Sequence, residues 1–145
     1  MDQIELRWRR LRPNALLPEQ QTALASGYDL HACLDEPLVL GTMPTRVPTG
    51  VAIASPAGID VQVRPRSGLF ARGVIGTVGT LDADYRGELF VTLYCLPDLG
   101  SFEITDGDRI GQIVVARLVD ASWLEVEELD ETVRGAGGHG STGLR

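Results

Sequence analysis

The chain has 145 residues, 43% of them apolar, and a formal net charge of −7 from 20 acidic and 13 basic side chains. The length fits one domain with its own core, and the composition excludes a disordered chain or a membrane-spanning one, because no apolar run approaches the roughly 20 residues that a bilayer requires. The acidic average charge also argues against binding to a nucleic acid polymer, although small anions can bind wherever arginines gather.

The first residues, Met1 to Glu5, lack the basic-then-apolar order of a signal peptide, so a cytoplasmic location is expected. Cys33 and Cys95 stand far apart without CxxC spacing, which indicates neither a metal knuckle nor a redox pair. We expect two small buried hydrophobic residues in a reducing compartment.

Short β-rich segments separated by Gly, Pro and Asp turns recur along the chain, and helical periodicity is nearly absent. The predicted strands are Ile4 to Arg9, Pro37 to Leu40, Thr45 to Ser55, Ile59 to Val63, Gly73 to Val78, Leu89 to Leu96, Ser101 to Ile104, Gln112 to Val119, and Trp123 to Glu127. One helical turn is predicted at Ser67 to Ala71, with Ser67 as its N-cap. Many short strands favour an all-β sandwich or jelly roll.

The composition changes after Trp123, where an acidic stretch leads into a glycine-rich end at Arg134 to Gly143. Five glycines in the last nine residues of that end cannot pack a core, so this part should be mobile. The sequence therefore predicts a domain over residues 1–133 and a C-terminal arm over residues 134–145.

The arm matches G-x-G-x-x-G through Gly135, Gly137 and Gly140, and it nearly matches a Walker A loop. Neither pattern has its required context, because almost no chain follows to form a helix and Ser141 stands where the loop needs lysine. Consecutive glycine N–H groups can still converge on phosphate oxygens, with hydroxyl and guanidinium donors beside them. A flexible solvated tail is the alternative, but the C-terminal position suggests a strap that closes over a polyphosphate.

Two internal segments also carry candidate functional residues. Arg64 to Leu69 places an arginine and a hydroxyl at a predicted strand-to-turn junction, where an anion could bind or where the turn is merely capped. Thr80 to Glu88 places Asp82, Asp84 and Tyr85 in a predicted hairpin region, for which a solvated acidic turn is the alternative. Both carboxylates would share a face if that backbone were extended.

Five segments resemble, in order, the five motifs of the trimeric dUTPase family. They are Ala25 to Leu30, Arg64 to Leu69, Gly79 to Glu88, Gly107 to Gln112, and Arg134 to Gly143. The resemblance implies a distorted jelly roll of the β-clip type that assembles as a homotrimer. It also implies active sites shared between subunits and a mobile arm from one chain closing a site formed by others.

The resemblance further implies hydrolysis of dUTP to dUMP and pyrophosphate, which limits uracil in DNA and supplies dUMP for dTMP synthesis. Asp82 matches the catalytic carboxylate that activates water for attack on the α-phosphate, and Tyr85 matches the ring beneath the deoxyribose. Mg²⁺ is implied as cofactor, held mainly by the triphosphate, with Asp29 acting indirectly through water or supporting a motif arginine. Asp108 and Arg109 look structural.

The residues expected to bind substrate belong to three groups. They are Arg66, Ser67, Gly68 and Gln112 for the phosphates; Gly76, Gly79, Thr80 and Leu81, in a hairpin, for uracil; and Arg134, His139, Gly140, Ser141 and Thr142 in the arm. Three positions depart from the family pattern: His139 replaces a stacking phenylalanine, Gly76 replaces an asparagine of many bacterial members, and Ser26 replaces an alanine. Uracil contact at position 76 is therefore expected through backbone only, and arm closure is expected to be weaker or pH-sensitive.

Two other functions are compatible with the same scaffold. One is a dCTP deaminase, which needs a glutamate proton shuttle and matches the Asp82 to Glu88 segment less well. The other is a non-catalytic nucleotide-binding protein, against which the presence of Asp82 argues.

Overall fold

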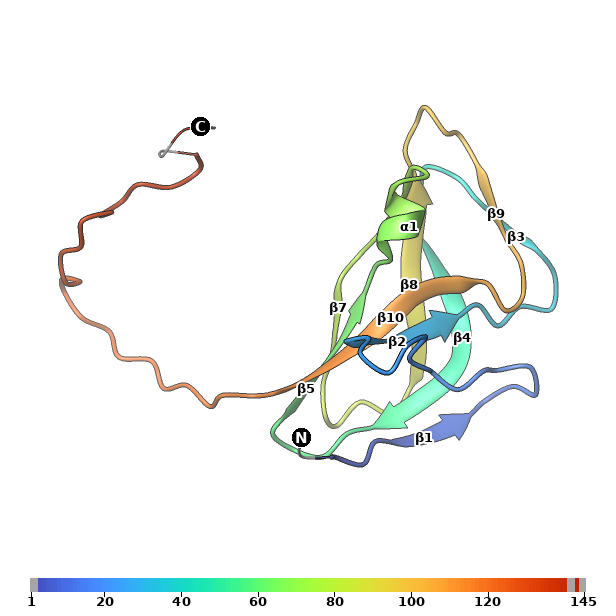
Figure 1. Ribbon diagram of the computed structural model, residues 1–145, viewed down its shortest axis with the longest axis horizontal. Helices are drawn as coiled ribbons and strands as arrows, with labels where there is room; N and C mark the ends of the chain where they lie inside the picture. The colour runs from blue at the N-terminus through green and yellow to red at the C-terminus, as the bar shows by residue number, and fades with distance from the viewer. Residues whose placement is uncertain (1–2, 141–142, 144–145) are drawn as a thin grey trace.

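The computed structural model describes residues 3–140 and 143, and its elements confirm the all-β prediction (Figure 1). In chain order they are β1 (Arg7–Arg10), β2 (Gly27–His31), β3 (Leu38–Leu40), β4 (Thr45–Ala54), β5 (Ile59–Arg64), α1 (Ser67–Phe70), β6 (Val74–Gly76), β7 (Gly79–Leu81), β8 (Glu88–Cys95), β9 (Phe102–Ile104) and β10 (Arg109–Arg117). No helix in the described part is long and apolar enough to cross a membrane.

Within the described part of the chain the strands form two four-stranded sheets and one two-stranded sheet, and every strand pair there is antiparallel. One large sheet has the order β1-β4-β8-β6, the other has the order β2-β10-β5-β7, and β3 pairs with β9. Neighbouring strands are mostly far apart in sequence, so each sheet joins distant parts of the chain. This arrangement places residues as far apart in sequence as Asp29 and Gln112 side by side.

Both large sheets contribute to one hydrophobic core. Alternate residues of β8, from Leu89 to Cys95, are buried, and β5 buries Ile59, Val61 and Val63 in the same alternating way. This is the period-2 pattern of strands that turn one face toward the core. Each large apolar side chain buried in this way contributes about 1.5–3 kcal/mol to the stability of the fold. Gly111 of β10 lies against β8, since a Cβ there would be 3.0 Å from Val91 Cγ2.

A bulge at Gly50 interrupts β4 between its two pairing segments with β8. Gly50 has a φ of 66°, and a Cβ there would lie 2.7 Å from Ala15 Cβ and 2.8 Å from Cys33 Sγ. Only glycine fits both the backbone conformation and the space. The Gly50 N–H donates to Glu88 Oε1 at 2.8 Å, which fixes the first residue of β8 to the bulge.

The predicted strand at Trp123 to Glu127 is absent from this chain. After β10 the Leu118 N–H donates to Gly58 O at 3.0 Å, and the chain then leaves the core (Figure 1). Trp123 is 96% exposed. A strand needs a neighbouring strand to pair with, and this segment pairs with none among residues 3–140 and 143, so its apolar alternation alone does not produce a strand.

Two local predictions are also wrong. The N-cap of α1 is Arg66 rather than Ser67, and no side chain caps the helix, because Ser67 already lies in its first turn. The segment from Gly76 to Leu81 is not a self-paired hairpin: β6 pairs with β8, whereas β7 pairs with β5. The chain crosses from one large sheet to the other at Thr77 and Val78. Strands β2 and β7 were not among the predicted strands.

Cys33 and Cys95 are both free and buried, as expected from their spacing. Burial raises the pKa of each thiol, because the low-dielectric interior disfavours the thiolate. Both residues therefore act as small hydrophobic groups of the core.

Candidate active site

Asp29 of β2 holds two arginines at one end of the second large sheet. Its Oδ1 lies 3.4 Å from Arg66 Nε and its Oδ2 lies 3.4 Å from Arg109 Nη1. Asp29 is only 8% exposed, and Arg66 also donates from Nη1 to Arg109 O at 3.2 Å. Two guanidinium groups against one carboxylate leave a local excess of positive charge on an otherwise acidic chain.

These residues line an open pocket of about 380 Å³, which we call the Arg66 pocket. Its walls come from the segment before β2, from β2, from the start of α1 and from β10: Gln21, Ala25, Ser26, Gly27, Asp29, Arg66, Ser67, Gly68, Arg109 and Gln112. Gln112 Nε2 donates to Pro65 O at 3.2 Å and so ties β10 to the turn that carries Ser67 and Gly68. A Cβ at Gly27 would collide with the Gln112 side chain, so glycine is needed there to keep this arrangement.

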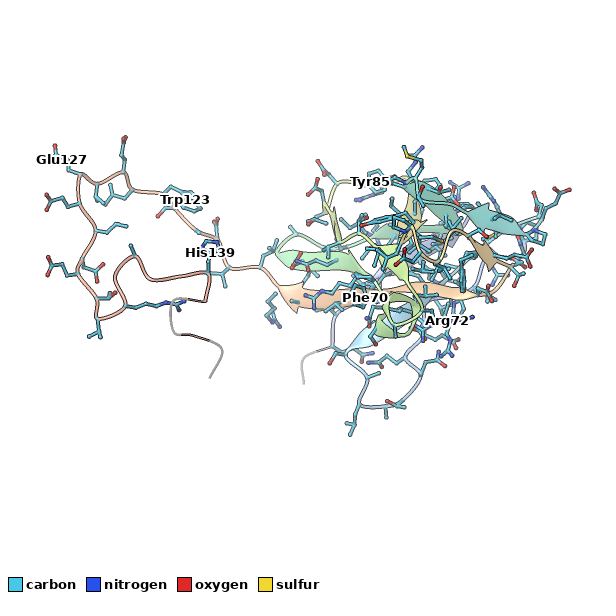
Figure 2. The ribbon with its side chains drawn as sticks, turned by 90° about the horizontal axis from the view of Figure 1, so that it is seen from above. Phe70, Arg72, Tyr85, Trp123, Glu127 and His139 are labelled. Atoms are coloured by element: carbon cyan, nitrogen blue, oxygen red, sulfur yellow. The ribbon has the colours of Figure 1, made fainter. Side chains whose placement is uncertain are left out.

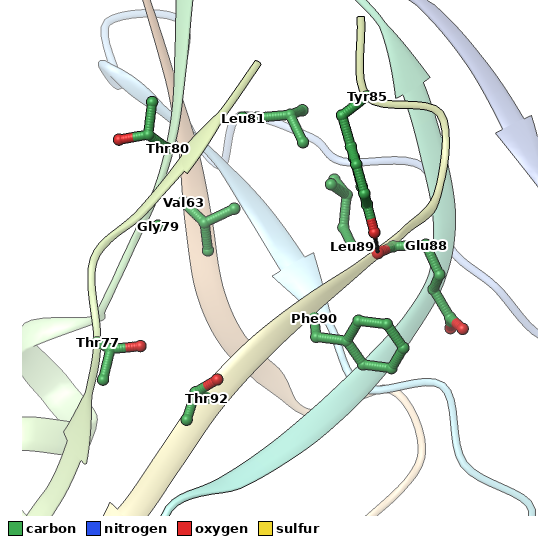
Figure 3. Close-up of a pocket in the computed structure, with 10 residues that line it drawn as sticks. All are labelled: Val63, Thr77, Gly79, Thr80, Leu81, Tyr85, Glu88, Leu89, Phe90 and Thr92. Atoms are coloured by element: carbon green, nitrogen blue, oxygen red, sulfur yellow. Dashed lines mark hydrogen bonds between the residues drawn. The ribbon is translucent and has the colours of Figure 1, made fainter.

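A second pocket of about 210 Å³ lies between β7 and β8, and we call it the Tyr85 pocket (Figure 3). Its lining is mainly apolar with hydroxyls among it: Val63, Thr77, Gly79, Thr80, Leu81, Tyr85, Glu88, Leu89, Phe90 and Thr92. Phe90 and Thr92 follow from the alternation of β8, which places them on the face opposite its core residues. Gly76, just before the crossing, has no room for a side chain, since a Cβ would lie 2.8 Å from Pro65 Cβ.

The turn between β7 and β8 holds Tyr85 against the start of β8. The Tyr85 N–H donates to Asp82 O at 3.0 Å, and Arg86 Nη1 donates to Ala83 O at 2.7 Å. The phenol Oη then donates to Glu88 O at 2.9 Å, shown as a dashed line in Figure 3. The backbone here turns instead of extending, so the condition under which Asp82 and Asp84 would share a face is not met.

Asp82 follows the last residue of β7 directly and is exposed. Among the described residues its carboxylate has no hydrogen bond or ion pair, whereas its backbone carbonyl anchors the turn. The carboxylate oxygens are thus available to water beside the Tyr85 pocket. A carboxylate placed in this way can accept a proton from a water molecule.

The two pockets share no lining residue. The arm adds its residues to neither of them in this chain, because it extends away from the core (Figures 1 and 2). Within it Arg134 Nε donates to Gly137 O at 2.8 Å, and His139 is exposed with a φ of 51°, beside Gly140. Ser141 and Thr142 lie outside the described residues.

The structure divides the predicted residues between two pockets and the arm, and Asp82 and Gly76 line neither pocket. Arg66, Ser67, Gly68, Gln112 and Asp29 meet in the Arg66 pocket, and Gly79, Thr80, Leu81 and Tyr85 meet in the Tyr85 pocket. Sequence reasoning missed Phe90 and Thr92, although the alternation of β8 could have indicated them. The resemblance implied that Asp29 could support a motif arginine, and the structure pairs Asp29 with both Arg66 and Arg109. Arg109, which was expected to be structural, also lines the Arg66 pocket.

No group of three His, Cys, Asp or Glu side chains in the described part could hold a metal ion. Asp29 is the acidic residue in the Arg66 pocket, and both its oxygens face arginines. The donor set therefore fits a cation carried mainly by a bound polyphosphate and water, with Asp29 as an outer partner at most.

Comparison with known proteins adds independent information. The family model for dUTPase matches residues 14–143. A deoxyuridine 5'-triphosphate nucleotidohydrolase of Treponema denticola is 48% identical over 139 residues, covering 93% of this chain and 96% of that protein. One from Wolinella succinogenes is 47% identical and covers 99% of this chain and 97% of that protein. The solved dUTPase of Staphylococcus bacteriophage 80alpha with dUPNHPP has a TM-score of 0.82 at 27% identity, over 97% of this chain and 99% of that chain.

Proposed function

We propose that this chain, which belongs to the dUTPase family and hydrolyses dUTP to dUMP and pyrophosphate, does so in sites that combine the Arg66 pocket of one subunit with the Tyr85 pocket of another. The observation that carries this proposal is the separation of the two pockets in a single chain. One is basic and suits a triphosphate, and the other is mainly apolar and suits a nucleoside. A homotrimer brings such complementary halves together at each interface.

The Arg66 pocket binds the triphosphate in this proposal. Arg66 and Arg109, held in place by Asp29, offer charge-assisted hydrogen bonds to phosphate oxygens. The Ser67 hydroxyl and the open backbone at Gly68, where nothing lies within 4 Å of a Cβ position, allow phosphate to approach closely. Gln112 supports this turn from β10 and faces the same space.

The Tyr85 pocket takes the deoxyuridine. The ring of Tyr85 lies beneath the deoxyribose and leaves no room for a 2′-hydroxyl, which separates dUTP from UTP. Backbone groups from Gly76 to Leu81 read the uracil edge, since position 76 has no room for a side chain. Buried backbone donors and acceptors that match the uracil edge are left unpaired when cytosine takes its place. Such mismatches can discriminate between two substrates by a factor of about 10⁴ or more.

Asp82 activates the water that attacks the α-phosphorus. Its unpaired carboxylate accepts the water proton as the new P–O bond forms, and pyrophosphate leaves on the opposite side of the phosphorus. The arm then supplies donors from Arg134, His139, Gly140, Ser141 and Thr142 around the outer phosphates and excludes bulk water. Mg²⁺, when bound with the triphosphate, neutralises part of its charge. We further infer that Asp29 orders water around that ion, and that the enzyme acts in the cytoplasm.

The exposure of the segment after β10 supports exchange of the arm between subunits. Val119, Trp123, Leu124 and Leu129 are each more than four-fifths exposed in the single chain. Apolar side chains in such number are normally covered, and no residue that the structure describes covers them. A neighbouring subunit provides that cover in the homotrimer we propose, with residues 134–145 as the part that closes the site.

Subunit complementation tests the shared site. Asp82→Asn damages the Tyr85 half and Arg66→Gln damages the Arg66 half, so each parent trimer should be nearly inactive. Coexpressed at equal levels, the two chains should regain activity, because about a quarter of the interfaces then join two intact halves. Pyrophosphate release measures the rate, and coexpression of two differently tagged Asp82→Asn chains is the control. Mixed trimers as inactive as their parents would show that each site lies within one chain.

A substrate comparison separates the hydrolase from a deaminase. Glu88, the carboxylate that lines the Tyr85 pocket, accepts from Gly50 N and lies 3.9 Å from Arg12, so it is engaged in holding the fold. We therefore expect pyrophosphate from dUTP and neither ammonia nor pyrophosphate from dCTP at the same concentration. Ammonia released from dCTP would overturn the assignment.

A further inference from the structure

Gly87 lies two residues after Tyr85, immediately before the start of β8. Gly87 is half-buried, and its φ lies outside the left-handed region, so its backbone conformation does not require glycine. The space beside it does. A Cβ at position 87 would collide with the Tyr85 hydroxyl and lie 2.6 Å from Tyr85 Cζ and 3.1 Å from Cε2.

The contact arises because Tyr85 folds back along the start of β8. Its Oη reaches past Gly87 to donate to Glu88 O at 2.9 Å, which sets the tilt of the ring at the mouth of the Tyr85 pocket (Figure 3). Glu88 is itself fixed, since its Oε1 accepts from Gly50 N at 2.8 Å. The acceptor is therefore rigid, and the ring is free to move only if the hydrogen bond breaks.

We propose that Gly87 is a positioning residue for sugar selection: its missing side chain is the space in which the Tyr85 phenol lies, and this placement sets the ring against the 2′ position. The inference rests on the proposed role of Tyr85 beneath the deoxyribose. Alanine at position 87 would displace the far end of one half-exposed side chain rather than any backbone. The fold is thus retained while the ring tilts and the sugar end of the pocket changes shape.

The measurement is the ratio of kcat/KM for dUTP to kcat/KM for UTP. Gly87→Ala should lower this ratio about tenfold or more, the scale on which a pocket discriminates a small group. Gly41→Ala is the matched control, because Gly41 has an ordinary φ and nothing within 4 Å of its Cβ position. That control should keep the wild-type ratio, and the thermal midpoints of both variants should stay close to that of the unsubstituted protein.

A double-mutant cycle with Tyr85→Ala shows whether Gly87 acts through the ring. In the Tyr85→Ala background, Gly87→Ala should change the ratio no further, because the group it displaces is absent. A wild-type ratio in Gly87→Ala, with a lowered ratio in Tyr85→Ala, would overturn the inference and leave the role of Tyr85 standing. Additive losses in the double variant would also overturn it. An unchanged ratio in Tyr85→Ala would instead refute the sugar-contact role, and the inference with it.

Discussion

Replacing Asp82 by Asn should lower kcat for dUTP about 10³-fold, within the range expected for loss of a general base. The amide keeps the shape of the side chain but cannot take the proton of the attacking water. The turn should persist, because it depends on the Asp82 carbonyl, which accepts from Tyr85 N at 3.0 Å. A non-hydrolysable dUTP analogue should therefore bind with nearly unchanged affinity, as measured by calorimetry.

Asp84→Asn is the matched control for that experiment. Asp84 lies in the same turn, is exposed, and makes no hydrogen bond or ion pair among the described residues. The substitution removes the same charge two residues away, so a general electrostatic effect would slow both variants alike. Equal losses in Asp82→Asn and Asp84→Asn would contradict a specific role for Asp82, as would full activity in the first.

Removal of residues 134–145 should reduce turnover by about 10²–10³-fold or more, since loss of a single well-placed phosphate or oxyanion donor already has effects of that size. The described arm residues lie outside the core, and none of them is buried. The truncated chain should therefore keep its thermal midpoint and its trimeric mass.

Pyrophosphate release and light scattering after gel filtration measure the two effects on one preparation. The unsubstituted full chain provides the reference for both. An active truncated trimer would exclude the arm from the site. Dissociation of the truncated protein would show that the arm holds the assembly together, so that loss of activity could not be attributed to closure.

The alternation of apolar and polar residues predicted those strands that bury one face against the core. β5 and β8 follow directly from apolar residues at every second position, and both lie in the common core. The same alternation failed at Trp123 to Glu127, because a strand also needs a backbone partner and sequence pattern does not supply one. The crossing at Thr77 shows the related limit, since apolar spacing cannot indicate to which sheet each half of a segment belongs.

The grouping of the site residues could likewise be predicted only where they lie close together in the sequence. Residues within one short motif, such as Arg66 to Gly68, were predicted together and do line one pocket. Arg109 and its partner Asp29 are 80 positions apart, and a contact over that separation is fixed by the pairing of β10 with β2, which spacing along the chain does not show. The split into two pockets could not be derived from spacing at all, because motif order along a chain does not say which motifs face each other.

The separation of the Arg66 and Tyr85 pockets has a thermodynamic consequence for a shared site. A nucleotide that contacts two chains is bound only by the assembled form, so nucleotide binding stabilises the oligomer by mass action. By reciprocity, anything that strengthens the association between chains also raises the affinity for nucleotide by the same factor. Dilution then weakens nucleotide binding as well as assembly. An inhibitor that contacts both the Arg66 pocket and the Tyr85 pocket stabilises the oligomer.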